Sequence, residues 1–300
     1  MYKFMLFEKN LELSFEFFPP RNEREYTSYE NTVKELSVYD TSFVSFTDGA
    51  GFSKSREIIR AVKILREYSN TEVVAHITSC DKGKKDIDNL IDTYIENKID
   101  SFLIIRGDCP RDDFLMDLDE HESFETDFKY SSDLIQYLNQ KSISKIGFGA
   151  FPSGHPEDKN FEETINTFLL KTNLGGTFSA TQLFFDAAEY IKFYQEVRKH
   201  EIAIPIYAGI MPLISFDQAK RFAQICDISL PKKLAEGFQS CKSKEEEREF
   251  GINYISELCD DLISFNADGL HFYTLNRFRA IKDIFTKINY EFKKTNKEKL

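Results

Sequence analysis

The sequence predicts a (β/α)8 barrel of the TIM type, an α/β fold, as a single domain over residues 1–300. Short β-rich runs alternate with longer stretches of helical periodicity, and no low-complexity linker divides the chain. The alternative fold is a doubly wound parallel sheet. That fold normally carries a Gly-x-Gly-x-x-Gly turn after an early strand, and the sequence contains no such turn.

The predicted strands are runs rich in Val, Ile, Phe and Leu, as is typical of parallel strands that are covered on both faces. In chain order they are Leu11–Phe18, Ser42–Thr47, Glu72–Thr78, Ser101–Arg106, Lys145–Phe151, Phe178–Phe184, Ile204–Ala208 and Gly269–Tyr273. Between them, apolar residues recur near a 3.6-residue period, as Ile58, Val62 and Leu65 do. These stretches predict helices over Tyr29–Val38, Ser55–Tyr68, Lys84–Asn97, Ser132–Asn139, Phe161–Leu170, Ala187–Lys199, Phe216–Cys226 and Phe278–Ile288.

One segment, Leu230–Leu262, does not fit the simple strand–helix repeat. It contains the charge run Lys242–Glu249, which suits the solvated face of a helix. We therefore expect an extra pair of helices before the last strand.

Composition excludes several classes of function. The chain has 39 Lys and Arg against 50 Asp and Glu, a net charge of -11, which disfavours binding to nucleic acids and to anionic membranes. Its five cysteines form no Cys-x-x-Cys pair and its five histidines no His-Glu-x-x-His motif, so no metal site is expected. No secretory signal and no long apolar run are present, which indicates a cytoplasmic protein.

The first predicted strand carries an unusual set of polar residues. Because side chains of a strand alternate between its faces, Glu12, Ser14 and Glu16 share the face that points into the barrel. Glu16 comes last, near the mouth, among phenylalanines and just before Pro19 and Pro20. A carboxyl group in such a frame is a candidate general acid. The alternative is a solvent-exposed glutamate on an edge strand.

Other polar residues follow the predicted strands, at the end of the barrel where TIM-type enzymes carry their chemistry. Arg106, Gly107 and Asp108 end the fourth strand, where they form either a ligand-binding turn or a local salt bridge. His76 and His155 are candidates near the third and fifth strands, although a lone strand histidine is commonly a hydrogen-bonded core residue.

Two further strands contribute candidates. The amide of Gln182 lies in an apolar strand and needs a partner, either in the protein or in a heterocyclic ligand. Tyr273 and Arg277 fall at the mouth after the last strand, where Arg277 either holds an anionic ligand or solvates a helix start. The residues alone thus indicate a barrel enzyme with an acid and an aromatic-rich mouth.

Five segments in this order resemble the bacterial methylenetetrahydrofolate reductase family over nearly the whole chain. They are Ser14-Phe15-Glu16-Phe17-Phe18-Pro19-Pro20, Arg106-Gly107-Asp108, His155-Pro156, Thr181-Gln182-Leu183-Phe184-Phe185-Asp186 and Phe272-Tyr273-Thr274-Leu275-Asn276-Arg277. The first and last are the most specific. The resemblance implies a TIM barrel that contains FAD, which NADH or NADPH reduces before methylenetetrahydrofolate is reduced to methyltetrahydrofolate in a ping-pong reaction. It also implies a place in one-carbon metabolism and methionine synthesis, and a homo-oligomer.

The resemblance assigns roles to individual residues. Glu16 matches the general acid that opens the folate ring, and Asp108 matches a carboxylate near the flavin. The other flavin-binding positions are Thr47, His76, Arg106, Gly107, Tyr130, Ser131, Phe151, His155 and Lys171, and the substrate-binding positions are Gln182, Gln218, Phe222, Tyr273 and Arg277. The chain departs from the family pattern at the flavin-side positions Asp48, Phe151 and Thr164, where Thr164 replaces an Asp, and in the segment Lys171-Thr172-Asn173-Leu174-Gly175-Gly176.

These departures support a second hypothesis. In it, the chain is a diverged, folate-binding barrel that has lost or altered its use of FAD and acts with a partner subunit. Eukaryotic members of the family carry a further regulatory domain, and we do not expect one in this chain.

Overall fold

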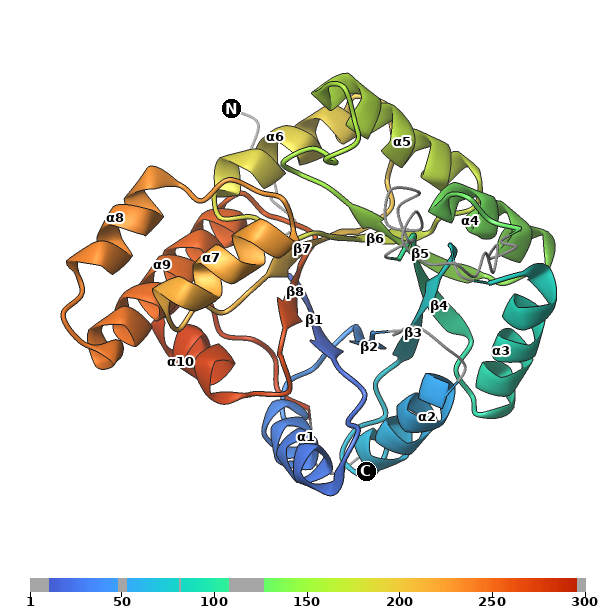
Figure 1. The fold of residues 1–300 in the computed structure, drawn as a ribbon, viewed down its shortest axis with the longest axis horizontal. Coiled ribbons are helices and arrows are strands. Elements are labelled where there is room, and N and C mark those ends of the chain that lie inside the picture. Colours follow the sequence, from blue (N-terminus) through green and yellow to red (C-terminus); the bar gives the residue numbers. More distant parts are fainter. Residues whose placement is uncertain (1–10, 48–52, 81, 108–126, 296–300) are drawn as a thin grey trace, which may run out of the picture.

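Eight parallel strands close into a barrel in chain order, with β8 paired to β1 (Figure 1). The structure is a computed structural model that describes residues 11–47, 53–80, 82–107 and 127–295. The strands are β1 (Glu12–Phe17), β2 (Phe43–Phe46), β3 (Val73–Thr78), β4 (Ser101–Ile105), β5 (Lys145–Ala150), β6 (Phe178–Thr181), β7 (Ile206–Ile210) and β8 (Gly269–Tyr273). The predicted TIM-type barrel is therefore confirmed.

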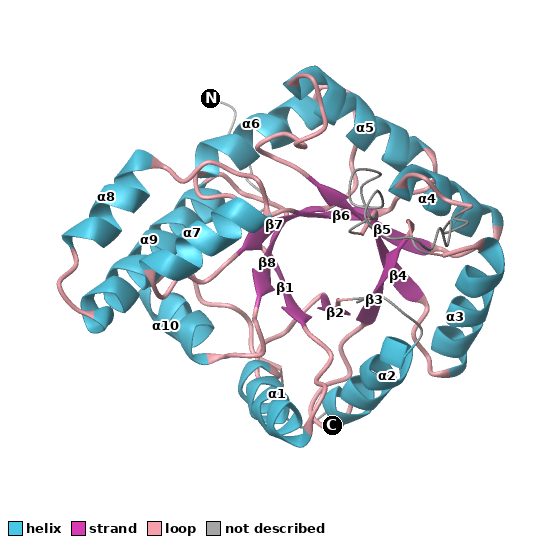
Figure 2. Ribbon diagram, in the orientation of Figure 1, coloured by secondary structure: helices cyan, strands magenta, loops and turns pink. Residues whose placement is uncertain are grey.

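The helices form a ring outside the strands (Figure 2). They are α1 (Glu23–Leu36), α2 (Ser53–Leu65), α3 (Lys84–Glu96), α4 (Ser131–Gln140), α5 (Phe161–Asn173), α6 (Ala187–Arg198), α7 (Phe216–Ile225), α8 (Lys232–Ser240), α9 (Lys244–Ser264) and α10 (Arg279–Lys287). The predicted extra pair before the last strand is confirmed as α8 and α9. Within the described ranges, none of these helices combines the length and apolar character needed to cross a bilayer.

The strands use their two faces differently. In β1, Leu13, Phe15 and Phe17 are at most 2% exposed and pack in the layer between barrel and helices. The inward residues of other strands, including Phe43 and Tyr207, form a separate apolar cluster inside the barrel. Full burial of such a side chain stabilises the folded state by about 1.5–3 kcal/mol. Both layers therefore stabilise the barrel, whose carboxyl end forms the mouth.

The amino-terminal end of the barrel is closed by polar contacts. Glu12 accepts hydrogen bonds from the hydroxyls of Ser42 and Tyr207. Glu72 pairs with Lys145 and accepts a 2.6 Å bond from Ser101. These contacts link the starts of β1, β2 and β7, and the starts of β3, β4 and β5, at the end opposite the mouth, where side chains of TIM barrels typically serve stability.

Several predicted boundaries were wrong, among them those of α1, β6 and β7. Helix α1 begins at Glu23 and not at Tyr29, because the side chain of Asn22 caps it by accepting from the Glu25 N–H at 3.0 Å. Strand β6 ends at Thr181, before the predicted end at Phe184. Strand β7 lies two residues later than predicted, since Pro205 has no N–H to donate to the ladder.

One buried ion pair joins helix α6 to the start of β8. Asp268 is 1% exposed and accepts from Arg198, from the Tyr194 hydroxyl at 2.8 Å and from the Ile206 N–H at 2.8 Å. Removing one partner of such a pair leaves a buried charge and several donors unsatisfied.

We predict that Asp268→Ala lowers the free energy of unfolding by about 3–5 kcal/mol, the usual cost of breaking a buried pair. Urea denaturation followed by circular dichroism measures the change. The matched control is Asp217→Ala, because the Asp217 side chain is 93% exposed and its bond to Lys220 lies on the surface. Equal losses in the two variants would contradict the prediction.

Candidate functional site

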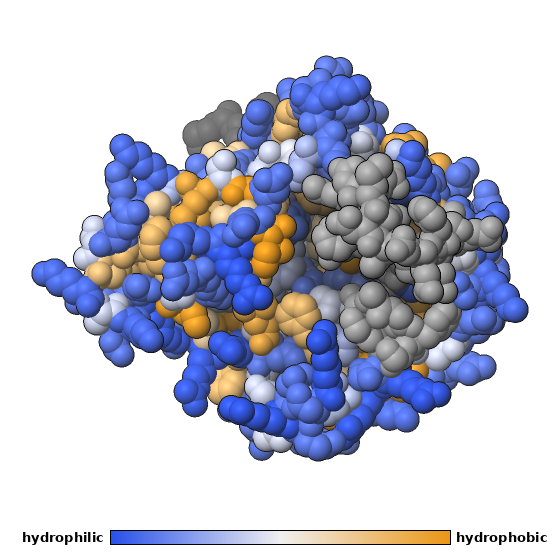
Figure 3. All heavy atoms as spheres, in the orientation of Figure 1, coloured by the Kyte–Doolittle hydropathy of each residue, from blue (hydrophilic) through white to orange (hydrophobic). Residues whose placement is uncertain are grey.

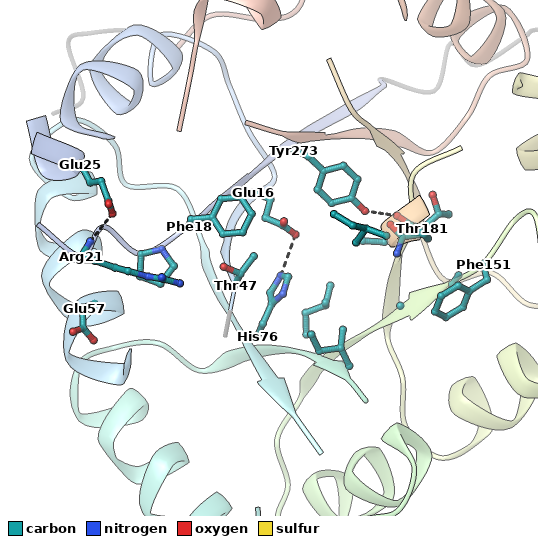
Figure 4. Close-up of a pocket in the computed structure, with 18 residues that line it drawn as sticks. Glu16, Phe18, Arg21, Glu25, Thr47, Glu57, His76, Phe151, Thr181 and Tyr273 are labelled. Carbon is teal, nitrogen blue, oxygen red and sulfur yellow. Dashed lines mark hydrogen bonds and ion pairs between the residues drawn. The ribbon is translucent and has the colours of Figure 1, made fainter. Parts of the chain in front are cut away.

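A cavity of about 970 Å³ opens at the carboxyl ends of the barrel strands (Figure 4). In the space-filling view the surrounding surface is mostly hydrophilic, with apolar side chains gathered over α7 and α9 (Figure 3). The cavity is lined from strands on all sides of the barrel by Glu16, Thr47, His76, Leu103, Ile105, Gly149, Ala150, Phe151, Ala180, Thr181, Gln182 and Tyr273, with Phe18, Pro19, Arg21, Glu25, Glu57 and Ile225 toward its rim.

Glu16 lies in this cavity between two histidines. It is 9% exposed, and its Oε2 is 3.5 Å from Nε2 of His76 and 3.6 Å from Nε2 of His271. The Nδ1 of His271 lies 2.8 Å from the hydroxyl of Ser14. Both distances to Glu16 exceed those of a good hydrogen bond, so the carboxyl group has polar neighbours without being fixed to them. This arrangement lets Glu16 exchange a proton with a bound ligand.

The backbone around Glu16 is held from the segment that follows β8. The Thr274 N–H and hydroxyl both donate to the Glu16 carbonyl, at 3.1 and 2.6 Å. The side chain of Asn276 accepts from the Phe18 N–H at 3.0 Å and donates to the Phe18 carbonyl at 2.8 Å. Thr274 and Asn276 therefore position the acid, a role that sequence reasoning missed. The signal for this role in the sequence was that both residues lie between Tyr273 and Arg277, which were predicted to lie at the mouth.

Tyr273 forms a second fixed element of the cavity, next to Glu16 in the β1–β8 register. Its hydroxyl donates to the Thr181 carbonyl at 2.5 Å. Burial raises the pKa of Tyr273 well above its usual value, and the Glu16 charge adds to this effect. Gly209 is required beside it, because a Cβ there would lie 2.2 Å from that carbonyl and 2.8 Å from the Tyr273 hydroxyl. Tyr273 is thus a neutral, oriented phenol at neutral pH.

A second cavity of about 400 Å³ adjoins the first. The two share Ile105, Gly149, Ala150 and Phe151, so they meet along β4 and β5. The second cavity continues between these strands and helices α4 and α5. Six predicted cofactor-binding residues line it, namely Arg106, Tyr130, Ser131, Phe151, His155 and Lys171.

The second cavity contains a buried cation. Lys171 is 8% exposed, and its Nζ donates to the Gly149 carbonyl at 3.4 Å. Burial lowers the pKa of Lys171 to about 8, and the carboxylate of Asp158 opposes this shift. Burial also lowers the pKa of His155, again against the nearby acidic groups. A ligand that brings negative charge to Lys171 would stabilise its protonated form.

At the rim of the second cavity, Arg106 forms two hydrogen bonds to the Glu157 carboxylate, one of them 2.8 Å long. Both side chains are substantially exposed, at 35% and 55%, so the pair contributes little to stability. Gly107 follows with φ +82°, and a Cβ there would lie 2.9 Å from Thr78. Glycine is therefore the residue that this turn accommodates.

The predicted site residues divide into four groups. Glu16, Thr47, His76, Gln182 and Tyr273 line the first cavity, and six cofactor positions line the second. Asp108 and the divergent Asp48 lie outside the described residues. Gly107, Gln218, Phe222 and Arg277 line neither cavity. Sequence reasoning had missed Phe18 and Ile225, which line the first cavity with side chains 43% and 63% exposed.

Three of the residues that line neither cavity, Gln218, Phe222 and Arg277, have local surroundings of their own. The amide of Gln218 accepts from the Ile214 N–H at 2.9 Å and donates to the Pro212 carbonyl at 3.2 Å, which fixes the loop before α7. Phe222 packs against the core, and Arg277 is exposed. Among the described residues, no three His, Cys, Asp or Glu side chains are grouped to hold a metal ion.

Comparisons with known proteins agree on one family. A family model described as methylenetetrahydrofolate reductase matches residues 2–289. A 5,10-methylenetetrahydrofolate reductase of Buchnera aphidicola subsp. Schizaphis graminum is 28% identical, over 91% of this chain and 90% of that protein. The enzyme of Escherichia coli is also 28% identical, over 89% and 87%. Methylenetetrahydrofolate reductase 1 of Schizosaccharomyces pombe is 30% identical over 94% of this chain, which spans 46% of that protein.

Among solved structures, an uncharacterized protein from Clostridium thermocellum has a similar fold. Its TM-score is 0.63 with 12% sequence identity, and the match covers 92% of this chain and 94% of that protein. That protein is described as binding two copies of 5-methyl-5,6,7,8-tetrahydrofolic acid. At this identity the match shows a common fold.

The buried Lys171 predicts a specific dependence of stability on pH. Its pKa of about 8 lies below the usual 10.5. Between these values the unfolded chain binds more protons than the folded chain, so Lys171 makes stability rise with pH in that window, by up to about 1.4 kcal/mol per unit. Urea denaturation from pH 7.5 to 10.5 should show this rise relative to Lys171→Met. Parallel curves for the two proteins would contradict it.

Proposed function

The chain belongs to the methylenetetrahydrofolate reductase family, and we propose that it reduces 5,10-methylenetetrahydrofolate to 5-methyltetrahydrofolate with FAD and NADH or NADPH. The observation that carries the proposal is the pair of adjoining cavities. One contains a buried carboxyl group beside two histidines, and the other contains a buried lysine. A substrate and a dinucleotide cofactor that react with each other would need two cavities that share a wall.

The residues of the second cavity fit a flavin dinucleotide. Lys171 and Arg106 would attract the diphosphate, and the buried amine fits an anion better than any neutral ligand. Phe151 lies on the wall that both cavities share, where a flat ring would pass. When bound there, FAD would accept hydride from NAD(P)H and return it to the one-carbon unit of the folate in a second half-reaction.

In the first cavity, Glu16 would donate the proton that opens the five-membered ring of the folate to an iminium. His76 and His271 contact Glu16 electrostatically at 3.5 and 3.6 Å and would steady the carboxylate after transfer. Tyr273 cannot replace Glu16 as the acid, because its raised pKa keeps its proton in place. Gln182 accepts from the Leu183 N–H at 2.9 Å, which orients its amide group in the folate cavity.

The relatives and the folate-binding protein of similar fold support a folate as substrate. The competing proposal is a diverged folate-binding barrel that does not use FAD. The departures at Phe151 and Thr164 motivate it, whereas the buried lysine of the second cavity argues for a retained anionic cofactor. We place the protein in the cytoplasm, because its five scattered cysteines form no Cys-x-x-Cys pair and suit a reducing compartment. The resemblance to the bacterial reductases supports a homo-oligomer.

A visible absorption spectrum tests the proposed cofactor. The purified protein, or apoprotein reconstituted with FAD, should show an oxidised-flavin spectrum that bleaches under anaerobic conditions with one of the two nucleotides. The nucleotide that bleaches it faster is the electron donor. A protein that binds folate but no flavin would favour the diverged barrel instead.

Glu16→Gln tests the proposed acid. Because general acid catalysis typically contributes about 10²–10⁴-fold, folate reduction should fall by that factor, while oxidation of NAD(P)H with an artificial acceptor stays nearly unchanged. Glu12→Gln is the matched control, since Glu12 lies on the same face of β1 at the opposite end of the barrel. Equal loss of both half-reactions in Glu16→Gln would contradict the assigned role.

A further inference from the structure

The wall of the second cavity includes the carboxylate of Asp158. Asp158 lies in the turn between β5 and α5, where its N–H donates to the His155 carbonyl at 2.9 Å. The hydroxyl of Thr164, in the first turn of α5, donates to Asp158 Oδ2 at 2.6 Å. Thr164 is 4% exposed, and both side chains line the cavity. The threonine therefore fixes the carboxylate at the cavity wall.

The charge of Asp158 acts toward the interior of this cavity. It raises the pKa values of both Lys171 and His155, two other wall residues, against the lowering effect of their burial. No described residue donates to its second oxygen, Oδ1. A carboxylate is an acceptor only, so the ligand group that it suits must carry donors. Phosphate oxygens carry no hydrogen-bond donors, and the Asp158 carboxylate would repel their negative charge.

We propose that Asp158 accepts hydrogen bonds from sugar-type hydroxyls of the cofactor, either on the ribityl chain or on the ribose of FAD. This inference rests on the proposed function. A ligand that bears both phosphates and hydroxyls matches the pairing of a buried cation with a fixed carboxylate. In other dinucleotide sites, an acidic side chain commonly binds a ribose diol in the same way.

Because Thr164 lies beside Asp158, the proposal can be tested by moving the carboxylate from position 158 to position 164. Since its hydroxyl ends 2.6 Å from the Asp158 carboxylate, a side chain at position 164 reaches nearly the same point of the wall. An aspartate at position 164 should then replace the one at position 158. The double variant Asp158→Ala with Thr164→Asp moves the carboxylate along the chain while keeping it in the cavity.

The experiment is a titration of apoprotein with FAD, followed by quenching of flavin fluorescence. Asp158→Ala should raise the Kd by about tenfold or more, as expected for lost hydrogen bonds to a charged group. The double variant should recover most of this loss, and the isosteric Asp158→Asn should bind weakly while keeping the native fold. Glu162→Ala is the matched control, because Glu162 is an exposed acid in the same helical turn that does not line the cavity.

Titrations with riboflavin and with ADP distinguish whether the ribityl chain or the ribose supplies the hydroxyls. If riboflavin loses affinity in Asp158→Ala, the ribityl chain is bound, and if ADP loses affinity, the ribose is bound. Equal Kd values for FAD in wild type, Asp158→Ala and Asp158→Asn would overturn the inference and leave the proposed function intact. The inference would also be overturned if Asp158→Ala lost affinity for FAD and the double variant did not recover it. Asp158 would then act only as a counter-ion of Lys171. Failure of the wild-type protein to bind FAD would overturn the proposed function and this inference together.

Discussion

The pairing of β1 with β8 is the contact on which the site depends. It closes the barrel, and its register sets Glu16 beside Tyr273 and Ser14 beside His271. The residues after β8 then return to β1. The Thr274 hydroxyl donates a hydrogen bond to the Glu16 carbonyl, and the Asn276 side chain donates to the Phe18 carbonyl. The acid is therefore fixed through its backbone while its carboxyl group stays free of short hydrogen bonds. A loop that carried Glu16 alone could not combine these two properties.

Burial shifts the pKa of one residue in each of the two cavities. It raises the pKa of the Tyr273 phenol in the first cavity and lowers the pKa of Lys171 to about 8 in the second. The phenol of Tyr273 thus lies beside the Glu16 carboxyl group with its proton retained. The second cavity has a buried cation whose desolvation an anionic ligand would offset. Under the proposed function, the first cavity would serve proton transfer and the second would bind an anionic cofactor.

Periodicity in the sequence was sufficient to predict the barrel and the inward face of Glu16, because both depend on the local alternation of apolar and polar residues. The extra helices α8 and α9 were predicted from a segment that breaks the strand–helix repeat and carries a charge run. The roles of Thr274 and Asn276 could not be predicted this way, because their partners lie about 258 residues away in the chain. For Gln218 the family pattern gave a substrate role, but in this structure both ends of its amide bond to the preceding loop.

The departure of Thr164 from the family pattern illustrates why single positions are weak evidence of lost function. Taken alone, the replacement of an acid by a hydroxyl removes a charge from the cofactor side. In the folded chain, however, that hydroxyl donates to Asp158, and a carboxylate still lines the same cavity. The chemistry of a site is set by which groups reach a point in space. A carboxylate six residues earlier can therefore reach the same cavity wall as the one that position 164 lacks, and only the fold shows that the two positions lie together.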